Sequence, residues 1–507
     1  MMTRRIGTVA AGLALAFSAA ACNNGLTDLN QDPNNPATAP SGPVFTRAVE
    51  QTAAQWLGTG FDLRGTEFIA QHLAEVQYPD EDRYQRLQSP NTTTYFDLPY
   101  ERQLADLNGV IQSGFTDNRP GIYGPAIVMM AWNFADLTDT WGDVPFSQAL
   151  KGDSGSIQPA YDKQQDIYRA LMDTLTFAAN AMANDPADDP GLGSADPIYG
   201  GDLAEWQKFA NSLHARLALR LVNVDQATAT AELTKAFTAP GGLITTNADN
   251  AQLNWPGDGV FNNPWADNFK SRDDHRMSQT LMNIMLANND PRIPVYAQPT
   301  QANASKYAGM PNGLINDSAG TYLQTASRPG AIFYAQNGGT SQPSYFMTAA
   351  EVLFIQAEAA ARGLGGLAAG QAQTFYNSAI TASLEQWGVT SAGSFLTQPG
   401  VAFAGPGAAG LKQIAVQKWI ALYTDGLQAW AEWRRTCQPQ TIQAGPAAIV
   451  DFVPRRLEYS QTEYTVNSTN MNDAISDQGA DNFGTRMYWD TQPATAPTYV
   501  DAATCGP

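Results

Sequence analysis

Apolar residues recur at helical spacing along most of this chain from about residue 43 onward. Short turns separate many of these stretches, which is typical of helical hairpins. The spacing is compatible with a degenerate two-helix repeat of the tetratricopeptide kind, although no repeat is visible as sequence identity. The pattern therefore predicts an all-α fold. The expected helices cover residues 43–57, 66–77, 92–112, 122–139, 161–184, 203–222, 226–237, 276–287, 348–362, 371–387 and 410–433.

Local signals mark the ends of some of these helices. Pro120 suits a first helical turn, where its missing N–H costs no hydrogen bond. Thr348 and Glu351 have the spacing of a capping box ahead of an apolar run. Gly363 follows Arg362, and a glycine at this place favours a left-handed end to the helix.

Four long stretches lack helical periodicity and are rich in Gly, Pro, Asn, Thr and aromatic residues. They cover residues 240–270, 291–347, 389–408 and 437–507. Loops of this length in a compact protein are usually functional or tightly packed. We therefore predict a single helical domain over residues 43–507, in which tetratricopeptide-like hairpins form the scaffold and long irregular loops are inserted.

The N-terminal segment has the order of an export signal. Two arginines precede an apolar run over residues 6–21 that ends in small residues and Cys22. This order predicts a signal peptide over residues 1–21, and the run is too short to remain as a membrane-spanning helix. Cys22 is the predicted lipid anchor of a bacterial lipoprotein, with acyl chains such as palmitate, and residues 22–42 are the predicted tether. An ordinary signal peptide with an incidental cysteine is the alternative.

The composition predicts a folded and acidic protein. Hydrophobic residues make up 43% of the 507 residues and aromatic residues 10%, which excludes a disordered chain. The net charge is −19, from 29 basic and 48 acidic residues. Such a charge argues against binding to nucleic acid and against direct docking on anionic lipid headgroups.

Two cysteines remain when Cys22 is set aside. Cys437 follows a predicted helix, and Cys505 lies in the C-terminal tail. In an oxidising compartment they could form one disulfide that holds the tail to the helix end. Two unpaired thiols are the alternative.

No catalytic constellation is visible. The three histidines, His72, His214 and His275, are far apart in the sequence. The chain contains no HExxH, GxSxG or phosphate-loop pattern. A glycosidase with two carboxylates remains open as an alternative, because its acids need not be close in sequence. We expect no enzyme activity, no cofactor and no metal.

The aromatic residues suggest ligand binding instead. A flat ring beside amide and carboxylate groups can stack on the apolar face of a sugar and bind its hydroxyls. Each such ring could instead pin its loop to the scaffold. The candidate ligand-binding aromatics in polar loops are Tyr78, Tyr84, Trp255, Phe261, Trp265 and Tyr334. Trp419, Tyr423, Trp430 and Trp433 have core spacing on helices and are expected to be packed.

Trp265 offers a direct test of this interpretation. If its ring faces the ligand, Trp265→Ala should weaken binding by about 1–3 kcal/mol, by analogy with stacking on nucleobases, with little loss of stability. A large loss of stability would indicate a core residue.

Motifs along nearly the whole chain occur in one consistent order. They are LNQDPNNP at 29–36, AWNFADLTDTWGDVPF at 131–146, NSLHARLALR at 211–220, NDPR at 289–292, TAAEVLFIQAEA at 348–359, QKWIAL at 417–422, WAEWRRT at 430–436 and PRRL at 454–457. With these motifs the chain resembles the SusD/RagB family of nutrient-binding outer-membrane lipoproteins.

The resemblance implies a function in partnership with a membrane transporter. Proteins of this family look like lids over a SusC-like TonB-dependent transporter, to which they deliver oligosaccharides captured outside the cell. It also implies an outer-membrane, lipid-anchored protein that faces the exterior and has no catalytic activity. The charged motif residues are expected to form structural ion pairs or helix caps. These are Arg216, Glu351, Glu358, Arg434 and Arg455.

Three alternatives remain open at this point. RagB-like relatives suggest peptides as the ligand, which would favour backbone hydrogen bonds over stacked rings. A secreted glycoside hydrolase would release new reducing ends from polysaccharide. A purely structural surface lipoprotein would bind no ligand.

Overall fold

The computed structural model describes residues 39–490, except residues 89, 153, 154, 156, 187 and 391. Helices dominate this part of the chain, and the predicted all-α class is confirmed. The longer helices are α2 (Ser41–Trp56), α4 (Thr93–Glu101), α5 (Gln103–Thr116), α6 (Pro120–Trp141), α7 (Gln164–Ala183), α8 (Leu203–Arg220), α9 (Gln226–Thr238), α11 (Gln279–Ala287), α14 (Ala349–Arg362), α15 (Ala372–Gln386), α16 (Ala408–Ala421), α17 (Gly426–Thr436) and α19 (Ser468–Gln478). The short ones are α3 (Glu67–Ile69), α10 (Pro264–Asn268), α12 (Ile293–Tyr296), α13 (Asn316–Gly320) and α18 (Gln461–Val466), and a π-helix spans Thr59–Thr66.

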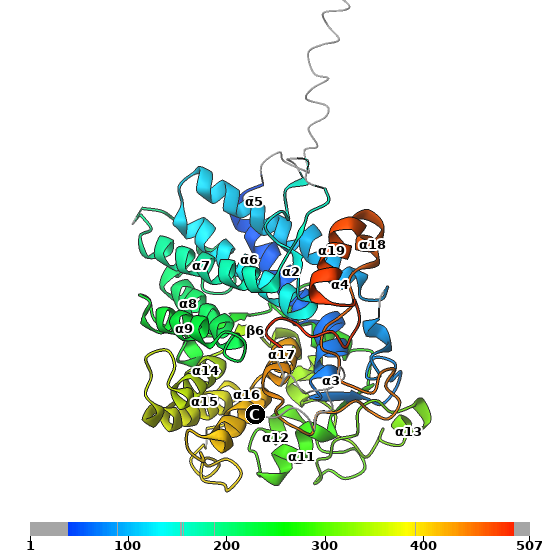
Figure 1. Ribbon diagram of the computed structural model, residues 1–507. Helices are drawn as coiled ribbons and strands as arrows, with labels where there is room; N and C mark the ends of the chain where they lie inside the picture. Colours follow the sequence, from blue (N-terminus) through cyan, green and yellow to red (C-terminus); the bar gives the residue numbers. More distant parts are fainter. Residues whose placement is uncertain are drawn as a thin grey trace, which may run out of the picture.

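Consecutive long helices form a stack of antiparallel pairs along one side of the molecule (Figure 1). In this stack α5 packs against α6, α6 against α7, α7 against α8 and α8 against α9. Farther along, α14 packs against α15 and α16, and α16 packs against α17. Helices α3, α11, α12 and α13 lie on the other side (Figure 1). The architecture is thus a tetratricopeptide-like scaffold with irregular segments gathered on one side.

Within the described residues, three two-stranded antiparallel sheets join segments of the chain to one another. The pairs are β1 (Leu73–Glu75) with β5 (His275–Met277), β2 (Val144–Pro145) with β3 (Tyr161–Asp162), and β4 (Ala251–Leu253) with β6 (Ser344–Met347). In the last pair Leu253 lies opposite Ser344. The first and last pairs connect irregular segments that are far apart in the sequence.

Several helix ends follow the local signals. α6 begins at Pro120, as predicted. At α14 the Thr348 hydroxyl accepts a hydrogen bond from the Glu351 backbone N–H, and Gly363 ends the helix at φ 68°. The Glu351 carboxylate is engaged by Arg216 instead of returning to the Thr348 N–H. The capping prediction is therefore right for the Thr348 hydroxyl. The Glu351 carboxylate forms a contact between helices instead of capping α14.

The prediction of a helix over residues 66–77 is wrong for most of its length. The α-helical part is only α3, and the chain turns at Gln71, which has a positive φ of 57°. Leu73 then pairs with Met277 in the sheet of β1 and β5. Strand pairing with a distant segment overrides the local helical preference here.

Two long predicted helices are each divided into two. The first turns at Arg102 between α4 and α5, where φ and ψ are −121° and −99°. The second ends with α16, and α17 begins after Thr424 at φ 81° and the cap residue Asp425. Gly426 follows, and a Cβ atom added there would lie 2.5 Å from the Glu67 backbone nitrogen. The second break therefore lets α17 approach the backbone near α3. Residues 461–478, predicted irregular, form α18 and α19.

Buried ion pairs connect the helices of the scaffold. Arg216 of α8 contacts Glu351 of α14 with Nε–Oε1 at 2.8 Å, and both side chains are buried. Arg435 of α17 contacts Glu358 of α14 with Nη1–Oε1 at 2.8 Å. The structural role predicted for these charged motif residues is confirmed.

The two remaining charged motif residues also lie in the core. Arg455 contacts Asp490 with Nη1–Oδ1 at 3.2 Å, and the Arg434 guanidinium lies 3.6 Å from the centre of the Trp430 ring. The aromatics predicted to pack in the core are buried as well. They are Trp419, Tyr423, Trp430 and Trp433.

Candidate functional site

Four of the six candidate ligand-binding aromatics are buried. They are Tyr84, Trp265, Tyr334 and Trp255, and Trp255 keeps 5% exposure at the wall of a cavity described below. Trp265 is only 3% exposed and lies 5.2 Å from the Phe333 ring, centre to centre. The Tyr334 ring stacks on Phe269 at 4.8 Å, and Tyr84 is also buried. These positions favour the alternative interpretation, in which such rings pin the irregular loops to the scaffold.

Tyr78 is the most exposed of the six, at 66%. Its ring lies 5.6 Å from the guanidinium carbon of Arg272, which forms an ion pair with Asp274. Tyr78 is not among the residues that line the cavities described below. It therefore stands as a single exposed ring beside a cation.

The remaining two, Trp255 and Phe261, lie in the wall of one cavity of about 670 Å³, here called the Trp255 cavity. It is open between the start of α2, the segment around Ala195 and the loop after β4. Pro residues and the two rings give it a largely apolar wall. The lining residues are Pro43, Thr46, Arg47, Glu50, Gln51, Ala195, Pro197, Leu253, Asn254, Trp255, Pro256 and Phe261.

Hydrogen bonds hold the Trp255 indole and the backbone that carries Phe261. The Trp255 Nε1 donates to the Ser344 hydroxyl at 2.9 Å, beside the pairing of β4 with β6. The Phe261 backbone N–H donates to the Asp258 carboxylate at 2.8 Å, as does that of Val260 at 2.9 Å. The turn around Asp258 thus holds Phe261, which is 48% exposed, over the cavity.

Polar groups of α2 face the same cavity. The Gln51 side-chain oxygen is buried and has no hydrogen-bond partner among the described residues. Burial raises the pKa of Glu50, and the positive charge of Arg47 opposes this shift. An unpaired acceptor and a carboxyl group beside aromatic rings are the groups that a polyhydroxylated ligand can satisfy.

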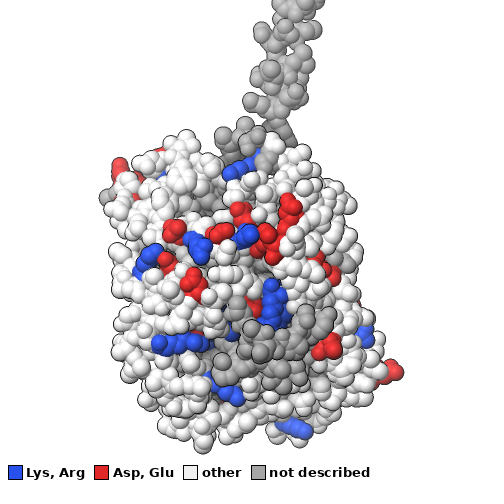
Figure 2. Space-filling model, in the orientation of Figure 1, with Lys and Arg blue, Asp and Glu red and all other residues white. Residues whose placement is uncertain are grey.

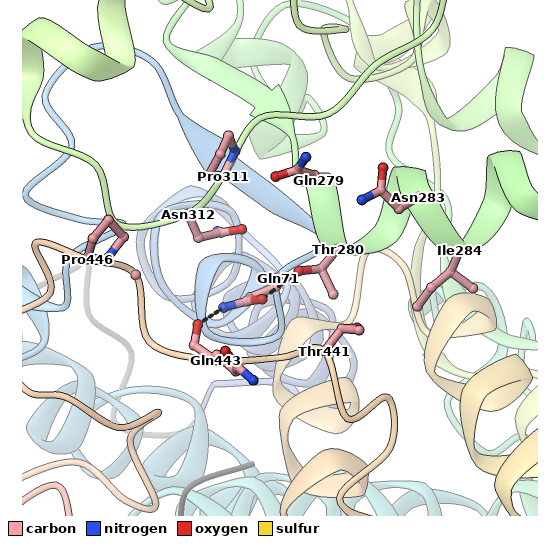
Figure 3. Close-up of a pocket in the computed structure, with 11 residues that line it drawn as sticks. Gln71, Gln279, Thr280, Asn283, Ile284, Pro311, Asn312, Thr441, Gln443 and Pro446 are labelled. Carbon is pink, nitrogen blue, oxygen red and sulfur yellow. Dashed lines mark hydrogen bonds between the residues drawn. The ribbon is translucent and has the colours of Figure 1, made fainter. Parts of the chain in front are cut away.

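A second hollow of about 280 Å³, here called the amide pocket, lies among the irregular segments (Figure 3). It is formed by α11, the chain around Asn312 and the chain around Gln443. Sequence analysis missed it, because only the fold brings these segments together. The chain around Asn312 and the chain around Gln443 belong to the long irregular stretches 291–347 and 437–507, and this was the sole signal. The lining residues are Gln71, Gln279, Thr280, Asn283, Ile284, Pro311, Asn312, Thr441, Gln443, Gly445 and Pro446.

The histidines serve structural contacts. His72 is buried between the Glu67 carboxylate and the Trp419 carbonyl oxygen, each 3.0 Å from a ring nitrogen, and burial lowers its pKa to about 3. His214 contacts Glu232 at 2.9 Å, and His275 lies beside an aspartate. In the described part of the chain, no group of three or more His, Cys, Asp and Glu side chains could hold a metal ion.

Some predictions concern residues outside the described part of the chain. These are the signal peptide at 1–21, the lipid anchor Cys22, most of the tether and Cys505. Cys437 is buried and disulfide-bonded, but its predicted partner Cys505 is not described. Between residues 39 and 490, none of the described helices is long and apolar enough to span a bilayer.

The surface visible in Figure 2 is mostly uncharged. Acidic and basic side chains lie interspersed on this face instead of forming one large field of a single sign. A surface of this kind is poorly suited to a polyanion such as nucleic acid.

Comparisons with known proteins point to one family. The SusD-like family described as starch-binding and associating with the outer membrane matches residues 33–460. No curated protein matches the sequence.

Solved structures of SusD homologues resemble the whole molecule. A chitin-binding SusD homologue from Flavobacterium johnsoniae is 25% identical, with a TM-score of 0.74 over 90% of this chain and 98% of its own. A SusD homologue from Bacteroides uniformis is 26% identical, with a TM-score of 0.74 over 90% and 100% of the two chains. One from Bacteroides vulgatus is 25% identical, with a TM-score of 0.76 over 88% and 97%.

Proposed function

This chain belongs to the SusD-like family, and from that membership we propose that it captures oligosaccharides at the cell surface and delivers them to a SusC-like TonB-dependent transporter. The family consists of non-catalytic binding proteins associated with the outer membrane, so the chain is a binding protein and not an enzyme. In this proposal the chain is the lid, and the transporter barrel carries the sugar across the membrane.

The observation that carries the proposal is the composition of the Trp255 cavity. Phe261, which is 48% exposed, supplies most of the open ring surface, and Trp255 contributes the little that its 5% exposure leaves accessible. Gln51 supplies an acceptor without a partner among the described residues. A sugar ring can stack its apolar face on Phe261. A hydroxyl can donate to Gln51 once its side-chain amide turns towards the cavity, because the oxygen itself has almost no accessible surface. An apolar ligand would leave the Gln51 oxygen unsatisfied, which is costly for a buried group.

The expected affinity is modest. Stacking contributes roughly 1–3 kcal/mol for each ring, by analogy with nucleobases, and association itself has a large entropic cost. A dissociation constant in the micromolar range, about 8 kcal/mol, is therefore reasonable. Weak binding suits a protein that must release its ligand to a transporter.

The family and its members support a glycan as the ligand class. The family is described as starch-binding, and one similar structure is that of a chitin-binding SusD homologue. Both ligands are neutral polymers, starch of glucose and chitin of N-acetylglucosamine. Neutral glycans also fit a cavity in which Arg47 and Glu50 carry opposite charges.

Attachment to the outer membrane completes the proposal. Cys22 would carry the acyl chains after cleavage of the signal peptide, and residues 22–42 would tether the body to the membrane, facing the exterior. Labelling with a palmitate analogue should modify the wild-type protein and leave Cys22→Ser unlabelled. Equal labelling of both would exclude Cys22 as the anchor.

Ligand arrays test the binding function directly. Protein that begins after Cys22 is applied to oligosaccharides and to peptides of similar length. Binding to a coherent set of glycans supports the proposal, and binding to peptides alone would replace it with the RagB-like alternative. Release of new reducing ends from polysaccharide would contradict the non-catalytic assignment.

The partnership with the transporter needs a separate experiment. A reversible cross-link between this chain and the barrel should abolish glycan uptake, and reduction of the cross-link should restore it. Uptake that continues while the cross-link is intact would rule out a moving lid.

A further inference from the structure

We propose that the amide pocket binds the acetamido group of an N-acetylated sugar unit. The inference rests on the proposed glycan-binding function and adds a chemical preference at a site separate from the Trp255 cavity. None of the residues that line one hollow also lines the other.

The floor of the amide pocket is held rigidly. Gln71 adopts a positive φ of 57°, and its side chain bridges two walls (Figure 3). Its Nε2 donates to the Gln443 carbonyl oxygen, and its Oε1 accepts from the Thr280 hydroxyl at 2.7 Å. A non-glycine residue in this conformation persists only when its surroundings hold it.

Asn312 completes the floor and is fully engaged. Its Nδ2 donates to the Leu73 carbonyl oxygen at 2.8 Å and to the Asp82 carboxylate at 2.7 Å. Its Oδ1 accepts from the Ser278 hydroxyl at 2.6 Å. Because both hydrogens of the Asn312 amide are used, new hydrogen bonds to a ligand must come chiefly from the rim.

The rim presents three side-chain amides and one hydroxyl, all on exposed residues. Gln279 and Asn283 are one helical turn apart on α11, and both stand above the floor in Figure 3. Gln443 and Thr441 lie on the opposite side of the pocket. The side chains of these four residues form no hydrogen bond to any other described residue.

An acetamido group matches this lining. Each side-chain amide offers a carbonyl acceptor and an N–H donor, so it can pair with the N–H and the C=O of an acetamido group. The apolar surfaces of Ile284, Pro311 and Pro446 can cover the methyl group. A sugar with hydroxyl groups alone would leave this apolar surface in contact with water.

The charge and the volume of the amide pocket restrict the kind of ligand further. None of the eleven lining residues is charged, so a protonated amino sugar finds no carboxylate partner in the pocket. No lining residue is aromatic either, so stacking is not the mode of binding. A volume of about 280 Å³ lies just below the range of pockets for larger ligands and suits about one sugar unit.

Three trimers with the same β-1,4 linkage test the inference by calorimetric titration of the full mature chain. They are the trimers of N-acetylglucosamine, glucosamine and glucose. The wild-type protein should bind the N-acetylated trimer at least about 10-fold more tightly than the glucose trimer.

Asn283→Ala and Gln279→Ala should each reduce this preference several-fold without changing the thermal midpoint. Asn180→Ala, an exposed asparagine on α7, is the matched control and should preserve it.

Each other result overturns the inference in a distinct way. Equal affinity for the acetylated and glucose trimers, or a preference that survives both pocket variants, refutes it while leaving glycan binding intact. Loss of all sugar binding on Phe261→Ala with no effect of Asn283→Ala assigns the ligand to the Trp255 cavity alone. Binding of an alanine tripeptide and of no sugar refutes both the inference and the proposed function.

Discussion

Trp255 donates from its Nε1 to the hydroxyl of Ser344 at 2.9 Å, and this bond ties the loop after β4 to the first residue of β6. The two segments are already paired in a small sheet, with Leu253 opposite Ser344. The indole therefore lies at a fixed place in the wall of the Trp255 cavity. A ring that is held before the ligand arrives loses little entropy on binding, which favours affinity.

Phe261→Ala should weaken glycan binding while leaving the fold intact. The ring is 48% exposed and lines the Trp255 cavity, so its removal costs stacking energy and little core packing. We expect a loss of about 1–3 kcal/mol in binding, by analogy with stacking on nucleobases, measured by titration with the glycan found on the array.

Phe177→Ala is the matched control for this variant. Phe177 is also 48% exposed, but it lies on α7 and does not line the Trp255 cavity. It should change neither binding nor the thermal midpoint. Equal effects of both substitutions on binding would remove Phe261 from the proposed site.

Gln51→Leu should separate binding from stability. The buried Gln51 oxygen lacks a partner among the described residues, and a buried unpaired acceptor is costly to the folded state. An apolar side chain of similar size should leave the free energy of unfolding unchanged or raise it by about 1 kcal/mol. The same change should weaken glycan binding about tenfold, since a sugar hydroxyl loses its acceptor. Tighter binding by the variant would contradict the role given to Gln51.

The sequence was sufficient to predict the helices whose ends carry local signals. α6 begins at Pro120 and α14 ends before Gly363, where the proline and glycine determine backbone conformation by themselves. The break before α17 depends instead on a distant contact, because Gly426 packs against the backbone of Glu67. The strand β1 likewise depends on β5, and neither contact leaves a local pattern.

The residues of the candidate site are equally hard to predict from the sequence. Trp255 and Trp265 lie in one irregular stretch, with Asn and Pro neighbours in both cases. Trp255, which is 5% exposed, lines a cavity. Trp265, which is 3% exposed, lies in α10 and packs against Phe333 and Tyr423. Residue type and neighbours are too similar to separate a ring at a cavity from a ring in the core, because burial is decided by segments far away in the sequence.

Trp265→Ala should therefore act on stability. The side chain is 3% exposed and contacts three other rings, those of Phe269, Phe333 and Tyr423. Truncating a buried tryptophan typically costs about 3–5 kcal/mol, measured as the free energy of unfolding in urea. An unchanged unfolding midpoint together with weaker glycan binding would restore Trp265 as a ligand contact.

Arg216→Met should destabilise the protein more than replacement of the whole ion pair. The single change leaves the Glu351 carboxylate buried without its partner, which typically costs about 3–5 kcal/mol. The double variant Arg216→Met with Glu351→Leu removes both charges and should recover much of that loss. Urea denaturation of all three proteins measures the difference.

An exposed pair provides the comparison for the buried one. Arg169 and Asp166 are both about half exposed on α7, and Arg169→Met should change the free energy of unfolding by less than about 0.5 kcal/mol. For the buried pair, a double variant Arg216→Met with Glu351→Leu that is less stable than Arg216→Met alone would contradict the prediction. It would show that loss of the pair itself, and not the unpaired carboxylate, lowers the free energy of unfolding.

Stability should fall as the pH is lowered, and Glu358 should account for part of the loss. Burial alone would raise the pKa of Glu358, but the charges of Arg435 and Arg362 outweigh it and lower the pKa to about 2. Its ordinary value is 4.5, so in the pH range between these two values the unfolded chain binds a proton that the folded chain does not. The stabilisation is complete above about pH 4.5 and is lost as the pH falls towards 2, with a total of about 3 kcal/mol.

Glu358→Gln should be less stable at pH 7 and should show a shallower fall in the free energy of unfolding between pH 5 and 2. The exposed Glu385→Gln on α15 is the control and should match the wild type. A fall of the same steepness in Glu358→Gln and the wild type would assign the acid sensitivity to other groups.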